Sequence, residues 1–315
     1  ESVRGMDLYI LVDVCNYSLT YSMSGNTNHM SPDDHYQNLK RIIAAVGGKA
    51  KRINVIMPFL YESRQHKRSS RESLDCALAL QELTHMGVDN IITFDAHDPR
   101  VQNAIPLSGF ETVRPTYQFV KGLLDRYDDL IIDSDHMMAI SPDEGATERA
   151  VYLANVLNLD MGMFYKRRDY TRVVNGRNPI VAHEFLGSSV EGKDVIILDD
   201  MISSGDSILD VAKQLKSRNA KRIFAAATFG LFTNGLDKFD EAYESGLIDG
   251  VLTTNLIYQT PELLSRPYYI NCDMSKYVAL MIDTLNHDGS ISDILDPSER
   301  IQVCVEEYKK AHGQL

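Results

Sequence analysis

Apolar and polar positions follow one repeating order along the chain. A short apolar run is followed by a polar loop, and then by a longer stretch with apolar residues three and four positions apart. Short apolar runs predict buried strands, and the wider spacing predicts helices. Strands are expected at 8–12, 53–59, 88–94, 137–140, 161–165, 195–198, 222–228, 250–254 and 267–270. Helices are expected at 36–46, 69–86, 146–157, 208–215, 277–285 and 299–311. Alternation of this kind predicts an α/β fold whose parallel sheets carry helices on both faces.

The stretch from 194 to 212 combines these signals most clearly. The apolar run 195–198 ends at Asp199 and Asp200, and a helical pattern begins at Ile208. The connecting loop would lie at the carboxyl end of a strand and the amino end of a helix, where unpaired N–H groups and the helix dipole favour an anion. We interpret the loop as a phosphate cradle, formed by Ser203, Ser204, Gly205, Asp206 and Ser207.

The two aspartates before the loop indicate a second kind of contact. A carboxylate repels phosphate, but it accepts hydrogen bonds from sugar hydroxyls or binds Mg²⁺. Phosphate beside a diol describes ribose 5-phosphate. The alternative is a buried strand followed by an acidic, solvated loop. The pair Asp199 and Asp200 together with the small-residue loop favours a ligand site, because ligands of open parallel sheets bind at the carboxyl ends of strands.

Polar clusters follow other expected strands. His97 lies in the sequence Asp-Ala-His-Asp after 88–94, and Asp143 follows 137–140. Such positions collect cation ligands and catalytic groups, although a lone histidine is more often structural. The loop 61–68 contains Arg64, and it is either a solvated surface or an anion site at a helix entrance. Ser69 and Glu72 have the spacing of a capping box at the start of that helix.

Two segments are expected to lack regular structure. The stretch 169–190 is polar and rich in turn residues, and it follows the basic sequence Lys166-Arg-Arg168. This length is typical of an active-site lid, and basic residues at its base could close over phosphates. The segment 16–34 is rich in Ser, Asn and Met, and we expect a mobile loop there.

Composition excludes several classes of protein. The net charge is −12 over 315 residues, so neither nucleic acid nor an anionic membrane is an expected partner. No apolar run is long enough to span a membrane, and no signal peptide is visible. The four cysteines have neither metal-binding nor redox spacing, which favours a reducing, cytoplasmic location. The sequence begins without methionine and reaches a strand almost at once, so we expect further residues upstream. Neither G-x-x-x-x-G-K-[ST] nor G-x-G-x-x-G occurs.

In their order along the chain, these motifs resemble those of the ribose-phosphate diphosphokinases, also called phosphoribosyl pyrophosphate synthetases. The resemblance covers nearly the whole chain, from Glu1-Ser-Val-Arg-Gly to Gly289-Ser-Ile-Ser-Asp-Ile. The matching motifs between them are Ser63-Arg-Gln, Asp95-Ala-His97, Ser141-Pro-Asp143, Lys166-Arg-Arg168 and Asp199-Asp-Met-Ile-Ser-Ser-Gly205. The Asp-Asp loop alone would fit any phosphoribosyltransferase, so the assignment depends on the whole series.

The resemblance implies two similar domains of the type I phosphoribosyltransferase kind. These would be 1–115 and 116–295, with a terminal helix at about 296–315 that packs on the first domain. It also implies an active site at the domain interface and across a subunit boundary of a homodimer or hexamer. The reaction would transfer the diphosphoryl group of ATP to the anomeric hydroxyl of ribose 5-phosphate, giving 5-phosphoribosyl 1-diphosphate and AMP.

The same resemblance implies roles for individual residues. Asp199 and Asp200 would hold the ribose hydroxyls, and Ser203 to Ser207 would cradle the 5-phosphate. His97 and Asp143 would ligate Mg²⁺, and His97 would also lie in the ATP site. Arg64 and Gln65 would contact ATP. Lys166 and Arg168 would stabilise charge on the transferring phosphorus.

Some residues depart from the family pattern, and two alternatives to an active synthetase stay open. Ser203 stands where the family usually has Asp, Asp206 where it has Gly, and His66 where it has Asp. These departures, together with the missing amino end, motivate a non-catalytic paralogue that regulates an active synthetase. A phosphoribosyltransferase is the third reading, and the match to the ATP loop and to His97 speaks against it.

Overall fold

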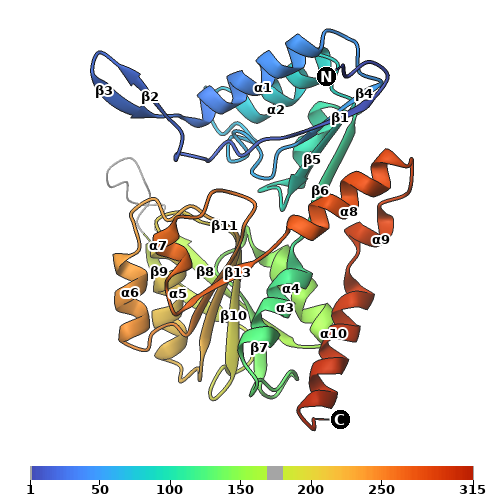
Figure 1. Ribbon diagram of the computed structural model, residues 1–315. Helices are drawn as coiled ribbons and strands as arrows, with labels where there is room; N and C mark the ends of the chain where they lie inside the picture. The colour runs from blue at the N-terminus through green and yellow to red at the C-terminus, as the bar shows by residue number, and fades with distance from the viewer. Residues whose placement is uncertain (1, 169–179, 315) are drawn as a thin grey trace. The chain divides into compact units, whose positions relative to one another are not determined.

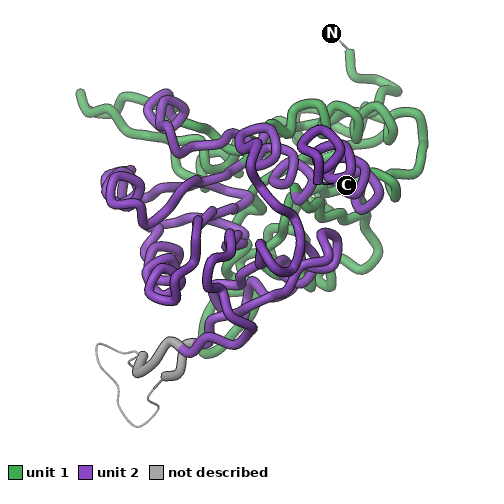
Figure 2. The backbone as a smooth tube through the Cα atoms, turned by 90° about the horizontal axis from the view of Figure 1, so that it is seen from below, with its two compact units in different colours: residues 1–115, 254–259, 273–296 green, residues 116–253, 260–272, 297–315 purple. Residues whose placement is uncertain are grey.

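The computed structural model describes residues 2–168 and 180–314, with the backbone alone for 166–168 and 180–183. The chain divides into two compact units, coloured separately in Figure 2. Unit 1 comprises Glu1–Pro115, Thr254–Gln259 and Asp273–Asp296. Unit 2 comprises Thr116–Thr253, Thr260–Cys272 and Pro297–Leu315.

Unit 1 is built on a parallel sheet of four strands in the order β1-β4-β5-β6. The strands are β1 (Asp7–Leu11), β4 (Arg52–Ile56), β5 (Asn90–Phe94) and β6 (Gly109–Val113). One core joins β1, β4 and β5 to the first two helices and to the 3₁₀ helix. The helices of the unit are α1 (Pro32–Val46), α2 (Asp75–His85), η1 (Pro99–Ala104), α8 (Ser275–Asn286) and α9 (Ser292–Leu295).

Unit 2 contains a seven-stranded sheet in the order β13-β12-β11-β10-β7-β8-β9. All neighbours with a described register are parallel except β8 and β9. The strands are β7 (Met137–Ser141), β8 (Asp160–Arg168), β9 (Ile180–Leu186), β10 (Asp194–Ile202), β11 (Ile223–Gly230), β12 (Gly250–Thr254) and β13 (Tyr269–Cys272). The helices are α3 (Thr116–Arg126), α4 (Thr147–Leu157), α5 (Asp206–Lys216), α6 (Asp237–Glu244), α7 (Pro261–Leu264) and α10 (Ser298–Ala311).

The sheet of unit 2 has a separate core on each face. Alternate residues of β10 point to opposite sides, as the pleat of a strand requires, so Ile196 and Leu198 join one core while Val195 and Ile197 join the other. The first core includes α3, α4 and α10, and the second includes α5 and α6 (Figure 1). The predicted α/β fold with parallel sheets between helices is therefore confirmed.

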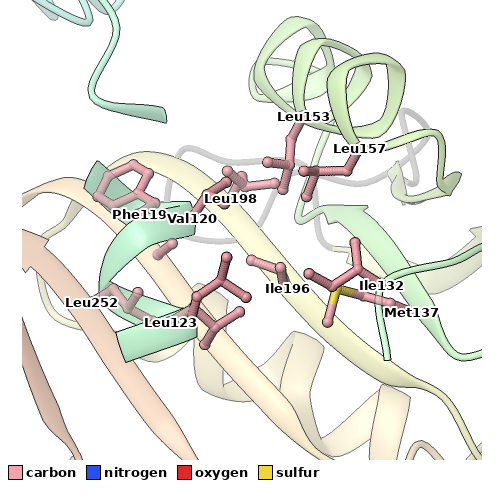
Figure 3. Close-up of a pocket in the computed structure, with 12 residues that line it drawn as sticks. Phe119, Val120, Leu123, Ile132, Met137, Leu153, Leu157, Ile196, Leu198 and Leu252 are labelled. Carbon is pink, nitrogen blue, oxygen red and sulfur yellow. The ribbon is translucent and has the colours of Figure 1, made fainter. Parts of the chain in front are cut away.

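A small cavity lies inside the first core of unit 2 (Figure 3). Its volume is about 20 Å³, close to that of one water molecule. Every residue that lines it is apolar, and the side chains come from α3, α4, the sheet and Ile132 in the connection before β7. Because it offers no polar partner, it is a packing void of the core and not a substrate site.

The amino ends of the strands are held by the same contacts in both units. In unit 1, Arg52 at the start of β4 pairs with Asp7 at the start of β1, and also with Asp288 at 2.6 Å. In unit 2, Arg222 precedes β11 and pairs with Asp194 at the start of β10 and with Asp129, each at 2.7 Å. Two strands in each sheet are thus tied together by a bidentate arginine.

A second contact is repeated between the units. The Ile53 amide in β4 donates to the carboxylate of Asp89, just before β5, at 2.7 Å. The Ile223 amide in β11 donates in the same way to Asp249, just before β12, at 2.9 Å. Strands β1, β4 and β5 therefore correspond to β10, β11 and β12.

Several expected boundaries were wrong. Residues 16–34 contain a two-stranded hairpin, β2 (Thr20–Met23) and β3 (Asn26–His29), and then the start of α1. The hairpin projects from the rest of unit 1 (Figure 1), and seven of its eight strand residues are exposed. Ser69 and Glu72 do not cap a helix, because α2 begins only at Asp75 without a side-chain cap. Their side chains do hydrogen bond to each other at 3.0 Å.

The expected lid and terminal helix also need correction. Part of 169–190 is regular, because β9 pairs with β8 from Ile180 onwards, while 169–179 lies outside the described residues. Helix α10 packs on α3 and α4 of unit 2, not on the first domain. Its Tyr308 hydroxyl accepts from the Leu130 amide at 3.0 Å and donates to the Tyr127 carbonyl at 2.8 Å.

Candidate active site

The paired aspartates lie within a strand and not after it. β10 continues to Ile202, and Asp199 stands opposite Ala227 of β11. The strand was expected to stop at Leu198, but Met201 and Ile202 still pair with Phe229 and Gly230. Asp199 and Asp200 are therefore held by a rigid element at the carboxyl end of the sheet, where ligands of such sheets bind.

The two carboxylates are close enough to affect each other's ionisation. Burial raises the pKa of Asp199 well above its ordinary value, and the neighbouring charge of Asp200 raises it further. Asp143 contributes in the same direction. The Asp200 side chain is almost fully buried. Two acids this close together favour one of two states. Either they share a proton, or a bound cation or hydrogen-bond donor relieves the repulsion between them.

Asp143 follows β7, the strand beside β10. Its Oδ1 accepts from the amides of Gly145 at 2.9 Å and Ala146 at 3.3 Å, just before α4. Its carbonyl accepts from the Ser141 hydroxyl at 2.6 Å. The structure thus places Asp143 at the same edge of the sheet as Asp199 and Asp200, with one carboxylate oxygen engaged by the backbone.

The phosphate-cradle loop is a three-residue connection, Ser203 to Gly205, between β10 and α5. Gly205 is the N-cap of α5 with φ +82° and provides no side-chain cap, while the Asp206 amide donates to the Ser204 hydroxyl at 3.4 Å. A Cβ at Gly205 would stand 2.5 Å from the Phe239 ring, so glycine is required both by conformation and by space. The loop therefore presents an open helix N-terminus, which favours an anion.

Asp206 is the first residue of α5, and its side chain has partners. Oδ1 accepts from the Lys238 ammonium at 2.5 Å, and Oδ2 accepts from the Ser204 hydroxyl at 3.0 Å. Lys238 belongs to α6, 32 positions along the chain. The sequence analysis predicted neither α6 nor this ion pair. No local pattern could reveal the pair, because its two residues lie 32 positions apart.

Lys166 and Arg168 lie at the end of β8. This strand runs beside β7, and Lys166 stands opposite His183 of β9. The structure describes the backbone of these two residues but not their side chains. Residues 169–179 lie outside the described part of the chain. Their catalytic role stays a prediction.

The expected ATP residues of unit 1 lie in the long connection between β4 and α2. Arg64 is exposed. The side-chain amide of Gln65 donates to the carbonyl of Ser73 at 2.9 Å, which ties the middle of the loop to its end near α2. The neighbouring His66 directs Nε2 toward the carboxylate of Asp98 at 3.5 Å, and its ring centroid lies 5.3 Å from that of His97. The sequence analysis did not anticipate this contact between the two histidines.

Asp98 anchors the loop after β5 that carries His97. Its carboxylate accepts from the Arg100 amide at 3.0 Å and pairs with the Arg100 guanidinium at 2.6 Å. The Arg100 contact is the main reason that the pKa of Asp98 falls to about 2. His97 itself is exposed. Among the side chains that the structure describes, no group of three or more His, Cys, Asp or Glu residues is arranged to hold a metal ion.

Comparison with known proteins decides which family these features belong to. Residues 1–87 match the N-terminal domain of ribose phosphate pyrophosphokinase, and residues 114–254 match the phosphoribosyl transferase domain. A ribose-phosphate pyrophosphokinase of Mycoplasma genitalium is 31% identical over 261 residues, which cover 82% of this chain and 71% of the relative. The chain belongs to the ribose-phosphate pyrophosphokinase family. The predicted family is thereby confirmed.

Further similarities agree with this assignment. The ribose-phosphate pyrophosphokinase of Vibrio parahaemolyticus is 28% identical over 93% of this chain and 84% of its own. The crystal structure of phosphoribosylpyrophosphate synthetase from Mycobacterium smegmatis has the same fold, with a TM-score of 0.74 at 24% identity over 92% of this chain and 85% of that one. These relatives give no support to a purely regulatory protein. No described helix is long and apolar enough to cross a membrane.

Proposed function

We propose that this member of the ribose-phosphate pyrophosphokinase family transfers the diphosphoryl group of ATP to the anomeric hydroxyl of ribose 5-phosphate. The products are 5-phosphoribosyl 1-diphosphate and AMP. The observation that carries the proposal is the β10–α5 segment, in which two aspartates on a strand are followed by an uncapped helix N-terminus. Hydroxyl-binding and phosphate-binding groups thus stand a few residues apart, as a pentose phosphate requires.

The sugar subsite consists of Asp199, Asp200 and the loop with its first helical turn. The carboxylates accept hydrogen bonds from the ribose hydroxyls, which relieves the repulsion that raises the pKa of Asp199. The 5-phosphate binds the open amides of α5 and the hydroxyls of the loop, from Ser203 to Ser207, with Ser204, Gly205 and Asp206 between them.

ATP binds the side chains Arg64, Gln65 and His97. A divalent cation, Mg²⁺ in our proposal, is held by His97 and Asp143. The carboxylates of Asp143 and Asp199 repel each other and would supply hard oxygen ligands, which suit Mg²⁺, and a bound cation would lower this repulsion. When bound, the ion neutralises phosphate charge.

In the reaction, the bond between the anomeric oxygen and the β-phosphorus forms, and the bond from the β-phosphorus to the bridging oxygen of AMP breaks. The hydroxyl proton leaves to solvent. The protein contributes alignment of these atoms and charge stabilisation. Lys166 and Arg168 stabilise the charge at the β-phosphorus.

AMP release from ATP, with and without ribose 5-phosphate, tests the proposal. We expect sugar-dependent AMP in the presence of Mg²⁺. The matched control is Lys166→Ala, which should lower the rate roughly 10²-fold, as for other preorganised charge stabilisers. Absence of sugar-dependent AMP would refute the proposal and favour the regulatory paralogue. Diphosphate-dependent nucleotide formation from a free base, without ATP binding, would favour a phosphoribosyltransferase.

We also propose that the enzyme works in the cytoplasm as a homo-oligomer, either a dimer or a hexamer. The acidic net charge supports the absence of a nucleic-acid or membrane partner. Light scattering coupled to size exclusion gives the mass, and a monomer at assay concentrations would contradict the proposal.

A further inference from the structure

Asp206 places a negative charge at the position where the proposed function needs an anion to bind. It is the first residue of α5, and its carboxylate therefore lies at the same helix N-terminus as the 5-phosphate subsite. A dianionic phosphate and a free carboxylate at one helix end repel each other. The loop can accept ribose 5-phosphate only if this charge is neutralised or directed away.

The structure shows two groups that hold the carboxylate. Lys238 donates to Oδ1 at 2.5 Å, and the Ser204 hydroxyl donates to Oδ2 at 3.0 Å. The Lys238 contact is the main cause of the lowered pKa of Asp206, and Ser204 is the second. Both oxygens of the carboxylate are therefore engaged, one of them by a full positive charge.

The core of unit 2 fixes the place of Lys238. The next residue, Phe239, is fully buried, and its ring stands where a Cβ of Gly205 would be. Phe232 packs edge-on against this ring, with centroids 5.2 Å apart. Because α6 is held against the loop by these contacts, the ammonium of Lys238 is delivered to Asp206 by the fold.

We propose that Lys238 is a positioning residue for ribose 5-phosphate, which acts by neutralising Asp206 and holding its carboxylate away from the phosphate. The inference rests on the proposed function. It predicts that the fold tolerates an acid at position 206 because α6 supplies the matching base. It also predicts that Lys238 matters only while the acid is present.

Binding of ribose 5-phosphate by isothermal titration calorimetry, at fixed ionic strength, tests this coupling. Lys238→Met should raise the Kd roughly five-fold, the size typical of one exposed charge at a helix N-terminus. Asp206→Asn should bind ribose 5-phosphate more tightly than the natural chain, because the charge that opposes the phosphate is removed. Adding Lys238→Met to Asp206→Asn should change the Kd less than two-fold. Lys216→Met is the matched control, because Lys216 lies in the last turn of α5 and donates to the Lys221 carbonyl at 3.2 Å.

Kinetics distinguish this role from a structural one. Lys238→Met should raise the KM for ribose 5-phosphate while kcat and the KM for ATP stay within two-fold. Lys238→Arg should restore the natural KM, since a guanidinium also pairs with the carboxylate. The loss caused by Lys238→Met should shrink in 0.5 M salt, because both side chains of the pair are about half exposed.

Two results would overturn the inference. One is an unchanged Kd in Lys238→Met. The other is an equal loss in the presence and absence of the Asp206 carboxylate, which would mean that Lys238 contacts phosphate directly or only supports the fold. Failure of the proposed function is distinguishable, because in that case the natural chain itself would neither bind ribose 5-phosphate nor release AMP.

Discussion

The connection after β1 and the connection after β10 leave corresponding strands of the two units, yet they prepare their helices in opposite ways. After β1, twenty residues that include the hairpin lead to α1, whose Ser31 and Asp34 form a complete capping box. After β10, three residues lead to α5, which begins at Gly205 with no side-chain cap. The first helix has a complete capping box, whereas the second has a glycine N-cap without a side chain and a single serine contact at its first amide.

At the amino ends of their strands, the two sheets are alike. In each unit an arginine bridges two aspartates. A further aspartate accepts a hydrogen bond from a backbone amide near the start of the neighbouring strand. The comparison teaches that contacts which stabilise the fold are shared at the amino ends of the strands. Chemistry differs at the carboxyl ends, where a change of loop does not disturb the sheet.

The largest expected effect is a difference in stability between variants of the two arginine clusters. Asp194→Ala should lower the free energy of unfolding by about 3 kcal/mol, because it leaves the largely buried Arg222 without its buried partner. Asp7→Ala should cost less, since Arg52 is more exposed than Arg222, and each arginine keeps its second partner, Asp288 or Asp129. Urea unfolding followed by circular dichroism measures both. Equal losses would show that burial of the arginine is not what distinguishes the clusters.

The next effect tests the open helix N-terminus. Gly205→Ala should weaken ribose 5-phosphate binding roughly ten-fold, or about 1.4 kcal/mol, because the new methyl group displaces the Phe239 ring and with it the loop. Gly246→Ala is the control. That glycine also has a positive φ, of +70°, but its Cβ would meet open space, so only about 1 kcal/mol of stability should be lost. Calorimetry with the sugar phosphate compares the two, and unchanged affinity in Gly205→Ala would contradict the assigned subsite.

A pH series probes the paired aspartates in the absence of ligand and metal. The folded-state pKa of Asp199 is raised by burial and by Asp200, so the folded chain holds a proton that the unfolded chain releases first. Stability from this group is therefore lost as pH rises from about 4 through the folded-state pKa. Asp199→Asn should raise Tm at pH 8 and leave it unchanged near pH 3.5. A lower Tm at pH 8 would show that the carboxylate stabilises the fold.

The smallest expected effect concerns the capped helix. Ser31→Ala removes one half of the capping box of α1 and should cost about 1 kcal/mol of stability, with no change in ribose 5-phosphate affinity. Thermal unfolding and calorimetry on the same preparation give both quantities. Altered sugar affinity would contradict the view that only α5 serves the ligand.

Prediction from sequence succeeded where local pattern decides structure. Strands β7 and β10 contain uninterrupted apolar runs, at 137–140 and 195–198, whereas the ligand roles of Asp199, Asp200 and the loop stay predictions. The hairpin was missed because β2 and β3 consist mainly of Thr, Ser and Asn and bury almost nothing. The end of β10 was missed because pairing with β11 continues past the two acids.

Contacts between distant residues could not be predicted. The apolar stripe of α10, Ile301, Val305 and Tyr308, is visible in the sequence, but the helices on which it packs are not. The same holds for Lys238 and Asp206, and for His66 and Asp98. In each case the partner is selected by the packing of elements far apart in the chain, and a local pattern does not contain that information.

The way the chain is shared between the units determines how late in synthesis each unit can be completed. Unit 1 takes residues up to 115 and then 254–259 and 273–296, while unit 2 is completed by the segment from Pro297 onwards. Neither unit can acquire all its parts until most of the polypeptide has left the ribosome. Translation that stops after β12 therefore yields a chain in which unit 1 lacks α8 and α9 and unit 2 lacks α10.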